Sequence, residues 1–95
     1  MVINDIEFYL FIMEKDKIIN IIGKKIREIR KIKGFSQEEF AYIADLERAF
    51  YGKLESKGKN LTLINLLKVA VALDVEVGEI FPPISEIKQF IKKDL

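Results

Sequence analysis

The sequence predicts an all-α fold with five helices, and three observations lead to that prediction. Apolar residues recur at helical spacing along most of the chain, Ser and Thr stand where helix starts need capping groups, and Gly or Pro residues separate the periodic segments. The chain has 95 residues, of which 49% are hydrophobic and 33% are charged. This composition is typical of one small globular domain with a single core.

The N-terminal segment, residues 1–16, is expected to be an extension or arm, and its pattern leaves its structure open. The apolar run from Phe8 to Met13 is too short to cross a membrane, and acidic residues flank it where a secretory signal would be basic. Alternate residues of this segment suit a strand, whereas Ile6, Leu10 and Met13 suit a helix. The residues before Met13 are either an added arm or the result of a start-site choice. The arm either covers its own domain or packs on a partner subunit.

The first firmly predicted helix runs from Ile18 to Lys33. At 100° per residue, its apolar stripe lies within an arc of about 80° and consists of Ile18, Ile22, Ile26 and Ile29. Gly34 follows in the position of a C-cap, and the basic residues of the last turn suit the helix dipole. Arg30 projects at the edge of the apolar arc, so we expect its charge to need a partner.

The next two helices are predicted to be short and tightly joined. Ser36 and Glu39 have the spacing of a capping box at the start of the second helix. The apolar face of this helix consists of Phe40, Ile43 and Ala44. A third helix, over about residues 46–55, begins only a few residues later. Two short helices joined in this way must cross steeply, which is the helix-turn-helix unit.

The last two helices are predicted from a capping residue and a break. Thr62 is expected to cap a fourth helix. Its apolar face consists of Leu63, Leu66, Leu67, Ala70 and Leu73. The pair Pro82-Pro83 cannot continue a helix, so a separate C-terminal segment is predicted over residues 82–95. Ser85 is expected to cap the helix of this segment.

The outer face of the predicted third helix has an unusual composition. Phe50, Tyr51 and Leu54 project toward the same side as Leu46, which is the buried side. The opposite side carries two small residues between two cations, namely Arg48, Ala49, Gly52 and Lys53. Gly costs a helix interior about 1 kcal/mol relative to Ala, which suggests a steric reason for it. Small residues let a helix lie deep in the DNA major groove, and Arg can address guanine there; the alternative is a surface helix with unremarkable Ala and Gly.

The formal net charge of +1 hides a strongly basic stretch. Residues 17–34 carry seven Lys or Arg against Glu28 alone. A nucleic acid responds to a locally positive surface rather than to the net charge. Taken by itself, the stretch favours an ordinary solvated helix face over a nucleic-acid surface.

Two residue types that support catalysis and metal binding are missing from the chain. There is no Cys and no His, so the chain has no disulfide, no thiolate metal site and no imidazole base. We therefore expect no enzyme activity, no metal ion and no cofactor. The missing Cys residues fit a cytoplasmic location.

Spaced motifs between residues 22 and 81 resemble a known family. They comprise a basic first helix, Gly34 before Ser36-Gln37-Glu38-Glu39, then Ala41, Leu46, Leu54-Glu55, Asn60 and the stretch LTLINLLKVAVALDV. This set, over about 60 of the 95 residues, resembles the lambda-repressor-like, Xre-type helix-turn-helix family. Within that family, the small size and the stretch LERAFYGKLE look most like the controller proteins of restriction-modification systems.

The resemblance implies a lambda-repressor-like DNA-binding domain over residues 17–81, with the third helix in the major groove. The positions that contact bases in the family fall on Arg48, Ala49, Gly52 and Lys53. The candidates for phosphate contact are Gln37, Tyr51, Lys57, Lys59 and Asn60. The family also pairs an arginine late in the first helix with the glutamate that ends the third, here Arg30 and Glu55.

Three residues depart from the family pattern. Asp45 stands where the turn usually has Gly, and Glu47 stands where Ser or Thr often caps the third helix. We expect Asp45 to serve as that cap, while both carboxylates would repel nearby phosphates. Lys57 stands where the loop usually has Gly, which alters the expected backbone contact.

The function implied by the resemblance is a transcriptional regulator that binds an inverted-repeat operator in double-stranded DNA as a homodimer. Residues 82–95 and the N-terminal arm are the expected dimer contacts. No membrane and no small-molecule substrate is expected. The alternative is a helix-turn-helix module for protein contact, such as an antitoxin or adaptor, in which the acidic turn weakens DNA binding.

Overall fold

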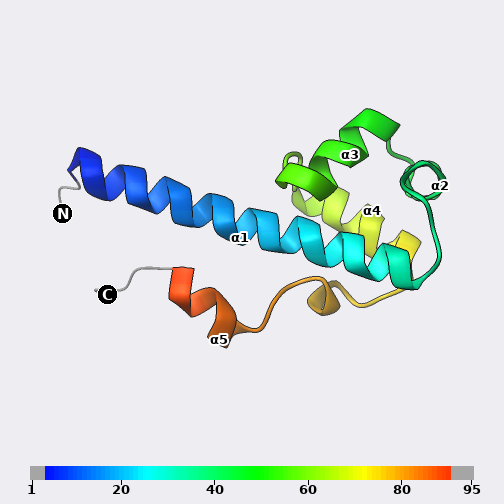
Figure 1. Cartoon of the computed structure of the whole chain (residues 1–95). Coiled ribbons are helices and arrows are strands. Elements are labelled where there is room, and N and C mark those ends of the chain that lie inside the picture. Colours follow the sequence, from blue (N-terminus) through cyan, green and yellow to red (C-terminus); the bar gives the residue numbers. More distant parts are fainter. Residues whose placement is uncertain (1–3, 91–95) are drawn as a thin grey trace.

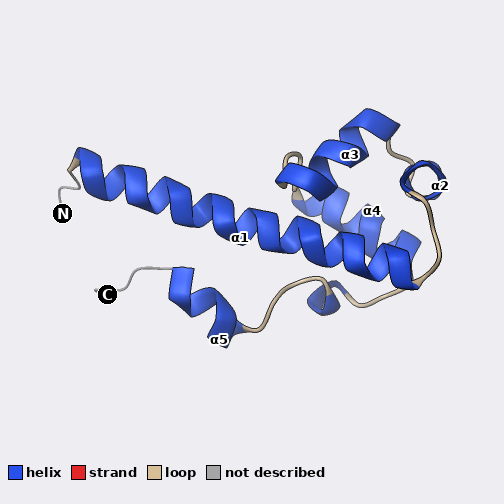
Figure 2. Ribbon diagram, viewed as in Figure 1, coloured by secondary structure: helices blue, strands red, loops and turns tan. Residues whose placement is uncertain are grey.

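The computed structural model describes residues 4–90, apart from the side chains of residues 7–13. This part of the chain contains helices and no strand, which confirms the predicted all-α class (Figure 2). The α-helices are α1 (Asp5–Ile32), α2 (Gln37–Ile43), α3 (Arg48–Lys57), α4 (Leu63–Leu73) and α5 (Ile84–Ile87). Two 3₁₀ turns, η1 (Val77–Glu79) and η2 (Lys88–Phe90), accompany them.

α1 is one continuous helix of 28 residues that projects beyond the rest of the molecule (Figure 1). The arm whose structure the sequence left open is therefore helical from Asp5 onward. The boundary expected between residues 16 and 17 lies inside α1, so the backbone has no break there. The apolar run from Phe8 to Met13 belongs to the same helix, and its side chains lie outside the described residues.

Three predicted helix ends are formed by the expected groups. Gly34 adopts a left-handed φ of 87° at the end of α1. In the capping box of α2, the Glu39 N–H donates to Ser36 Oγ over 3.1 Å, and the Ser36 N–H donates to Glu39 Oε1 over 3.0 Å. Thr62 Oγ1 accepts a 3.2 Å hydrogen bond from the Asn65 N–H at the start of α4. These three predictions are confirmed. They could be made from the sequence because each cap depends on residues only a few positions apart.

The C-terminal helix begins differently from the prediction. α5 starts at Ile84 with Pro83 as its N-cap residue, and no side chain caps it. Ser85 lies inside the helix because Pro83 sets the start two residues earlier, so the expected Ser85 cap is wrong. Residues 91–95, the end of the predicted C-terminal segment, lie outside the described residues.

The core lies where α1, α3 and α4 meet. Its fully buried large side chains are Ile26, Phe40, Tyr51, Leu54, Val69, Leu73 and Ile80. Two glycines let α1 come close to the end of α3. A Cβ atom on Gly23 would lie 2.6 Å from the Glu55 carbonyl oxygen, and one on Gly58 would overlap the Ile19 side chain. Gly58 also has a φ of +66°, which favours glycine, so this contact fixes the last turn of α3 against α1.

The C-terminal segment turns back along α1. Figure 1 shows α5 beside the projecting half of α1, and η2 is in contact with that helix. Within the described part of the chain, no helix has the length and apolar character needed to cross a membrane.

Candidate nucleic-acid interface

The third helix begins two residues later than predicted. α3 runs from Arg48 to Lys57, and Glu47 is its N-cap. The Glu47 carboxylate accepts 3.0 Å hydrogen bonds from the N–H groups of Ala49 and Phe50. These two hydrogen bonds lower the pKa of Glu47, so its charge is held at the positive end of the helix.

Asp45 does not cap α3, which corrects the expectation from the sequence. It adopts a left-handed φ of 59° in the turn between α2 and α3. This is a conformation that Gly adopts freely and that Asp tolerates better than most residues. Asp45 therefore takes the conformational role of the usual turn glycine, and Glu47 takes the capping role.

The two faces of α3 are as predicted. Tyr51 and Leu54 are fully buried, while Leu46 and Phe50 are partly buried. The outward side carries the predicted base-contacting residues, of which Arg48, Ala49 and Lys53 are exposed and Gly52 is partly exposed. The structure therefore brings all four candidates to one surface.

Gly52 meets no steric obstacle within its own chain. A Cβ atom built on it would have Gln37 Oε1 at 3.8 Å as its single neighbour within 4 Å among the described atoms. This is ordinary van der Waals contact, and Gly52 has no positive φ. Packing and backbone conformation would therefore both accept Ala at this helix position, so neither explains the glycine.

Arg30 and Glu55 form a buried ion pair between α1 and α3. Arg30 Nε donates to Glu55 Oε2, and Arg30 Nη2 donates to Glu55 Oε1, both over 2.8 Å. Arg30 Nη1 also donates to the Phe35 carbonyl oxygen over 2.6 Å, at the start of the loop to α2. The guanidinium thus connects α1, α3 and the chain before α2, which is an anchoring role rather than a DNA contact.

The charges of this pair are stabilised by their hydrogen bonds. Burial by itself would raise the pKa of Glu55, but the hydrogen bonds from Arg30 and Gln37 outweigh it and hold the pKa below its ordinary value. The hydrogen bond to Glu55 raises the pKa of Arg30 against the opposing effect of burial. Both groups therefore stay ionised inside the protein.

Tyr51 is not available for phosphate contact, so that prediction is wrong. Its side chain is 0% exposed, and its ring lies 5.2 Å from that of Phe40. Burial, followed by the nearby Glu55 carboxylate, raises the pKa of the Tyr51 hydroxyl above its ordinary value. The hydroxyl is buried, with no hydrogen-bond partner among the described residues, because this side of α3 faces the core.

Gln37 joins the same network from the first turn of α2. Its Nε2 donates a 3.1 Å hydrogen bond to Glu55 Oε1. The predicted phosphate-contacting residue thus has one donor already engaged within the protein. Its amide lies beside Gly52, between α2 and the outward side of α3.

The loop after α3 presents the other predicted phosphate contacts. Lys57 and Lys59 are exposed on either side of the buried Gly58. Asn60 adopts a left-handed φ of 67°, and its carbonyl oxygen accepts a 2.9 Å hydrogen bond from Asn65 Nδ2. The two lysines are therefore free to reach outward from a loop that α4 holds in place.

Arg27 is a cation near this surface that the sequence did not single out. Its side chain is 57% exposed, and its Nε lies 3.9 Å from Glu55 Oε1. Glu55 already binds Arg30, so this longer contact leaves most of the Arg27 charge directed toward solvent. The signal for it was its place one turn before Arg30 on the basic first helix.

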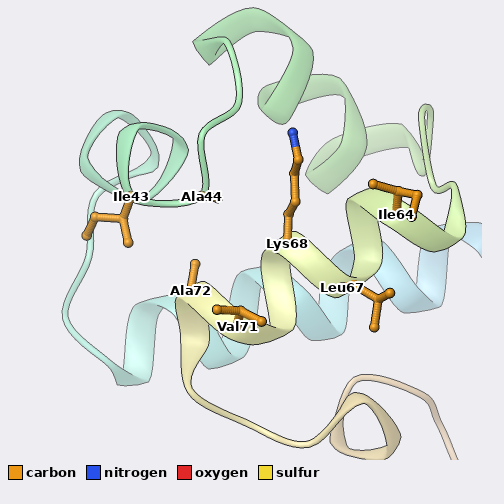
Figure 3. A pocket seen from close by; sticks show the side chains of 7 residues that line it. All are labelled: Ile43, Ala44, Ile64, Leu67, Lys68, Val71 and Ala72. Carbon is orange, nitrogen blue, oxygen red and sulfur yellow. The ribbon is translucent and has the colours of Figure 1, made fainter.

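An exposed apolar face lies on another side of the domain, along α4. Figure 3 shows the outward side chains of α4 beside the end of α2. The exposed fractions are 61% for Ile64, 40% for Leu67 and 80% for Val71. With Ile43 and neighbouring residues, they line a shallow groove of about 480 Å³. No described residue of the chain covers this face.

The described residues include no cluster of three or more acidic side chains that could hold a metal ion. The surface around α3 is instead one of cations and small residues. It can approach a polyanion, with Arg48 and Lys53 as donors to bases or phosphates.

Comparisons with known proteins agree with this geometry. A family model described as helix-turn-helix matches residues 26–80. Control protein C.MunI from Mycoplasma sp is 37% identical over 65 residues, which are 67% of this chain and 88% of that protein. Control protein C.SmaI from Serratia marcescens is 36% identical over 63 residues, or 66% of this chain and 75% of that protein.

Two solved structures share the fold. The restriction-modification controller protein C.AhdI from Aeromonas hydrophila has a TM-score of 0.64 and 41% identity, covering 66% of this chain and 96% of that one. The hypothetical transcription factor NHTF from Neisseria has a TM-score of 0.66 and 32% identity, covering 82% of this chain and 88% of that one. With the family match over more than half of its length, the chain belongs to the Xre-like helix-turn-helix family of DNA-binding transcriptional regulators.

Proposed function

We propose that this protein is a controller-type transcriptional regulator that binds an inverted-repeat operator as a homodimer. Its proposed location is the cytoplasm. In this proposal, α3 lies in the major groove with Arg48, Ala49, Gly52 and Lys53 against the base edges. The similarity to several control proteins supports the regulator class.

The observation that carries the DNA contact is the open space at Gly52. A glycine inside a helix is destabilising by about 0.5–1 kcal/mol relative to Ala, and this chain would accept Ala without a clash. An approaching surface outside the chain is therefore the best reason for the missing side chain. The cations Arg48 and Lys53 on the same face favour a nucleic acid as that surface.

The sugar-phosphate contacts are assigned to cations that surround α3. Lys57 and Lys59 extend from the loop after α3, with Asn60 beside them, and Arg27 extends from α1. Such contacts position the domain without reading sequence. Each subunit contributes three of these cations, Arg27, Lys57 and Lys59. If all six in a dimer lie on phosphates, log K plotted against log salt should have a slope of about −5.

The dimer contact is assigned to the apolar face of α4. Ile64, Leu67 and Val71 repeat at the three- and four-residue spacing of a helix-packing seam, and all three are exposed. The C-terminal segment expected to serve this role already contacts α1 through η2. A two-fold dimer should place its recognition helices about 34 Å apart, one turn of DNA.

A second candidate function rests on the same apolar face. If another protein covers α4, the domain is a protein-contact module of the antitoxin or adaptor kind. The exposed carboxylates Asp45 and Glu47, close to α3, favour this alternative because they repel phosphates.

Selection of bound sequences from a random duplex pool tests the proposal. The regulator predicts an enriched inverted repeat whose half-sites are about one helical turn apart. Binding to that repeat should weaken steeply with salt. A pool without an enriched motif at low salt would contradict the proposal and leave the protein-contact module.

A further inference from the structure

Gln37 occupies an unusual position, because its side chain connects the buried ion pair to the outward side of α3. It is the first residue of α2. Its Nε2 donates to Glu55 Oε1 over 3.1 Å, and the same oxygen accepts a 2.8 Å hydrogen bond from Arg30. Glu55 is only 3% exposed, so this acceptor is held rigidly by its surroundings.

The chemistry of Glu55 determines which way the Gln37 amide faces. An ionised carboxylate only accepts hydrogen bonds, so the NH₂ group of Gln37 must face it. Hydrogen bonds keep the pKa of Glu55 low despite its burial, so the carboxylate stays ionised. The amide oxygen of Gln37 is therefore turned away from Glu55.

That oxygen lies at the gap left by Gly52. Gln37 Oε1 is 3.8 Å from the position a Cβ atom of Gly52 would take. Gly52 shares its helix face with Arg48 and Lys53. Gln37 is partly exposed, and because Gly52 has no side chain, no Cβ atom stands beside its amide oxygen on this face of α3.

We propose that Gln37 reads a base pair: its Oε1 accepts a hydrogen bond from an exocyclic amine, adenine N6 or cytosine N4, in the major groove. This inference rests on the proposed DNA-binding function. Both amines are donors in that groove and match the amide oxygen, whereas a phosphate offers only acceptors and could pair only with the second N–H of Nε2, not with this oxygen. The Glu55 contact acts as the positioning element, since it fixes the orientation of the amide.

The test removes one functional group from each partner. On the selected operator, adenine is replaced by purine, or cytosine by 2-pyrimidinone, one position at a time, so that single amines are deleted. The parent protein should lose roughly three- to tenfold in affinity at one position of a half-site, as expected for one hydrogen bond. Gln37→Met keeps a side chain of similar length without the oxygen. At that position, this variant should bind the duplex that has the amine and the duplex that lacks it with equal affinity.

A different pattern would overturn the proposal. If Gln37→Met weakens binding to all duplexes by one common factor, and the parent's response to every amine deletion is retained, Gln37 contacts the phosphate backbone instead. If the parent selects no operator at all, the proposed DNA-binding function fails before this inference is reached. The two failures are therefore distinguishable.

Gly52→Ala provides a second variant whose folding is not in question, because a methyl group fits there at 3.8 Å from Gln37 Oε1. The methyl group would stand between the oxygen and the base. Deleting the amine at that position should therefore no longer weaken binding by this variant. Base changes at positions that Arg48 contacts should still weaken it. Lys15→Ala, an exposed change on the projecting half of α1, is the matched control and should leave every position unchanged.

Discussion

Arg30 and Glu55, 25 residues apart in the chain, are joined by two hydrogen bonds of 2.8 Å between guanidinium and carboxylate. This pair holds the last turn of α3 to the last turns of α1. Glu55 is also the hydrogen-bond partner of Gln37, so one buried carboxylate connects the core with the first turn of α2. Its protonation state therefore affects folding.

Stability should fall in acid because of Glu55. Its pKa in the folded protein lies below the ordinary value of 4.5, so the unfolded chain binds more protons in that range. The stabilisation is present above pH 4.5 and is lost as the pH falls through the folded pKa. Urea unfolding at a series of pH values should show this loss, and Glu55→Gln should show a smaller one. Because it breaks the buried pair, Glu55→Gln should also lower the free energy of unfolding by about 3–5 kcal/mol at pH 7. Glu28→Gln, a change at an exposed position, is the control.

Arg48→Ala and Lys53→Ala should each weaken operator binding without lowering the melting temperature. Both side chains are exposed on the outward face of α3, so their removal leaves no cavity. Arg48→Ala should lose at least about fivefold in affinity, as expected for a base contact. Lys15→Ala serves as the control for a lost positive charge. Parent-like binding by both α3 variants would rule out the groove contact.

Gly52→Ala should separate stability from binding. The free energy of unfolding should rise by about 0.5–1 kcal/mol, because Ala favours a helix and the chain has room for the methyl group. Affinity for the operator should fall, because the methyl group faces the DNA. Chemical denaturation and fluorescence anisotropy measure the two effects. An affinity that rises with stability would show that nothing approaches this face.

Glu47→Ser should strengthen DNA binding while keeping the helix start intact. Ser can accept a hydrogen bond from the first turn of α3 as Glu47 does, but it carries no charge. The loss of one exposed negative charge should raise affinity about two- to fivefold at low salt. Glu47→Ala, which loses the cap as well, should melt at a lower temperature. Equal binding by all three proteins would show that Glu47 lies away from the phosphates.

Val71→Lys should convert the proposed dimer into a monomer. Val71 is 80% exposed on α4, so the change should not disturb the folded subunit. Ile84→Lys, on the C-terminal helix at 68% exposure, should leave the dimer intact. Sedimentation equilibrium distinguishes the two species. A monomer produced by Ile84→Lys alone would return the dimer contact to the C-terminal segment.

The sequence predicted those parts of the fold that depend on neighbouring residues. The capping box of Ser36 and the caps at Gly34 and Thr62 act within one turn, so their spacing is informative. The start of α3 was harder, because Asp45 and Glu47 can both cap a helix. The choice depends on the backbone conformation of Asp45, which spacing does not reveal.

The site could be predicted only as far as one helix face. Arg48, Ala49, Gly52 and Lys53 share that face by periodicity alone. Tyr51 was misassigned although periodicity already placed it on the buried side of the helix, because its hydroxyl was taken as a free donor; its ring neighbour Phe40 belongs to another helix. The contact of Gln37 with Glu55 spans 18 residues and is tertiary.

α1 has a consequence for any larger assembly. Its 28 residues span about 42 Å without a break, and the backbone at Gly23 touches the last turn of α3. A partner bound at the N-terminal end of α1 would therefore lie at a fixed distance and orientation from α3. The projecting half of α1 is a rigid spacer and not a flexible linker.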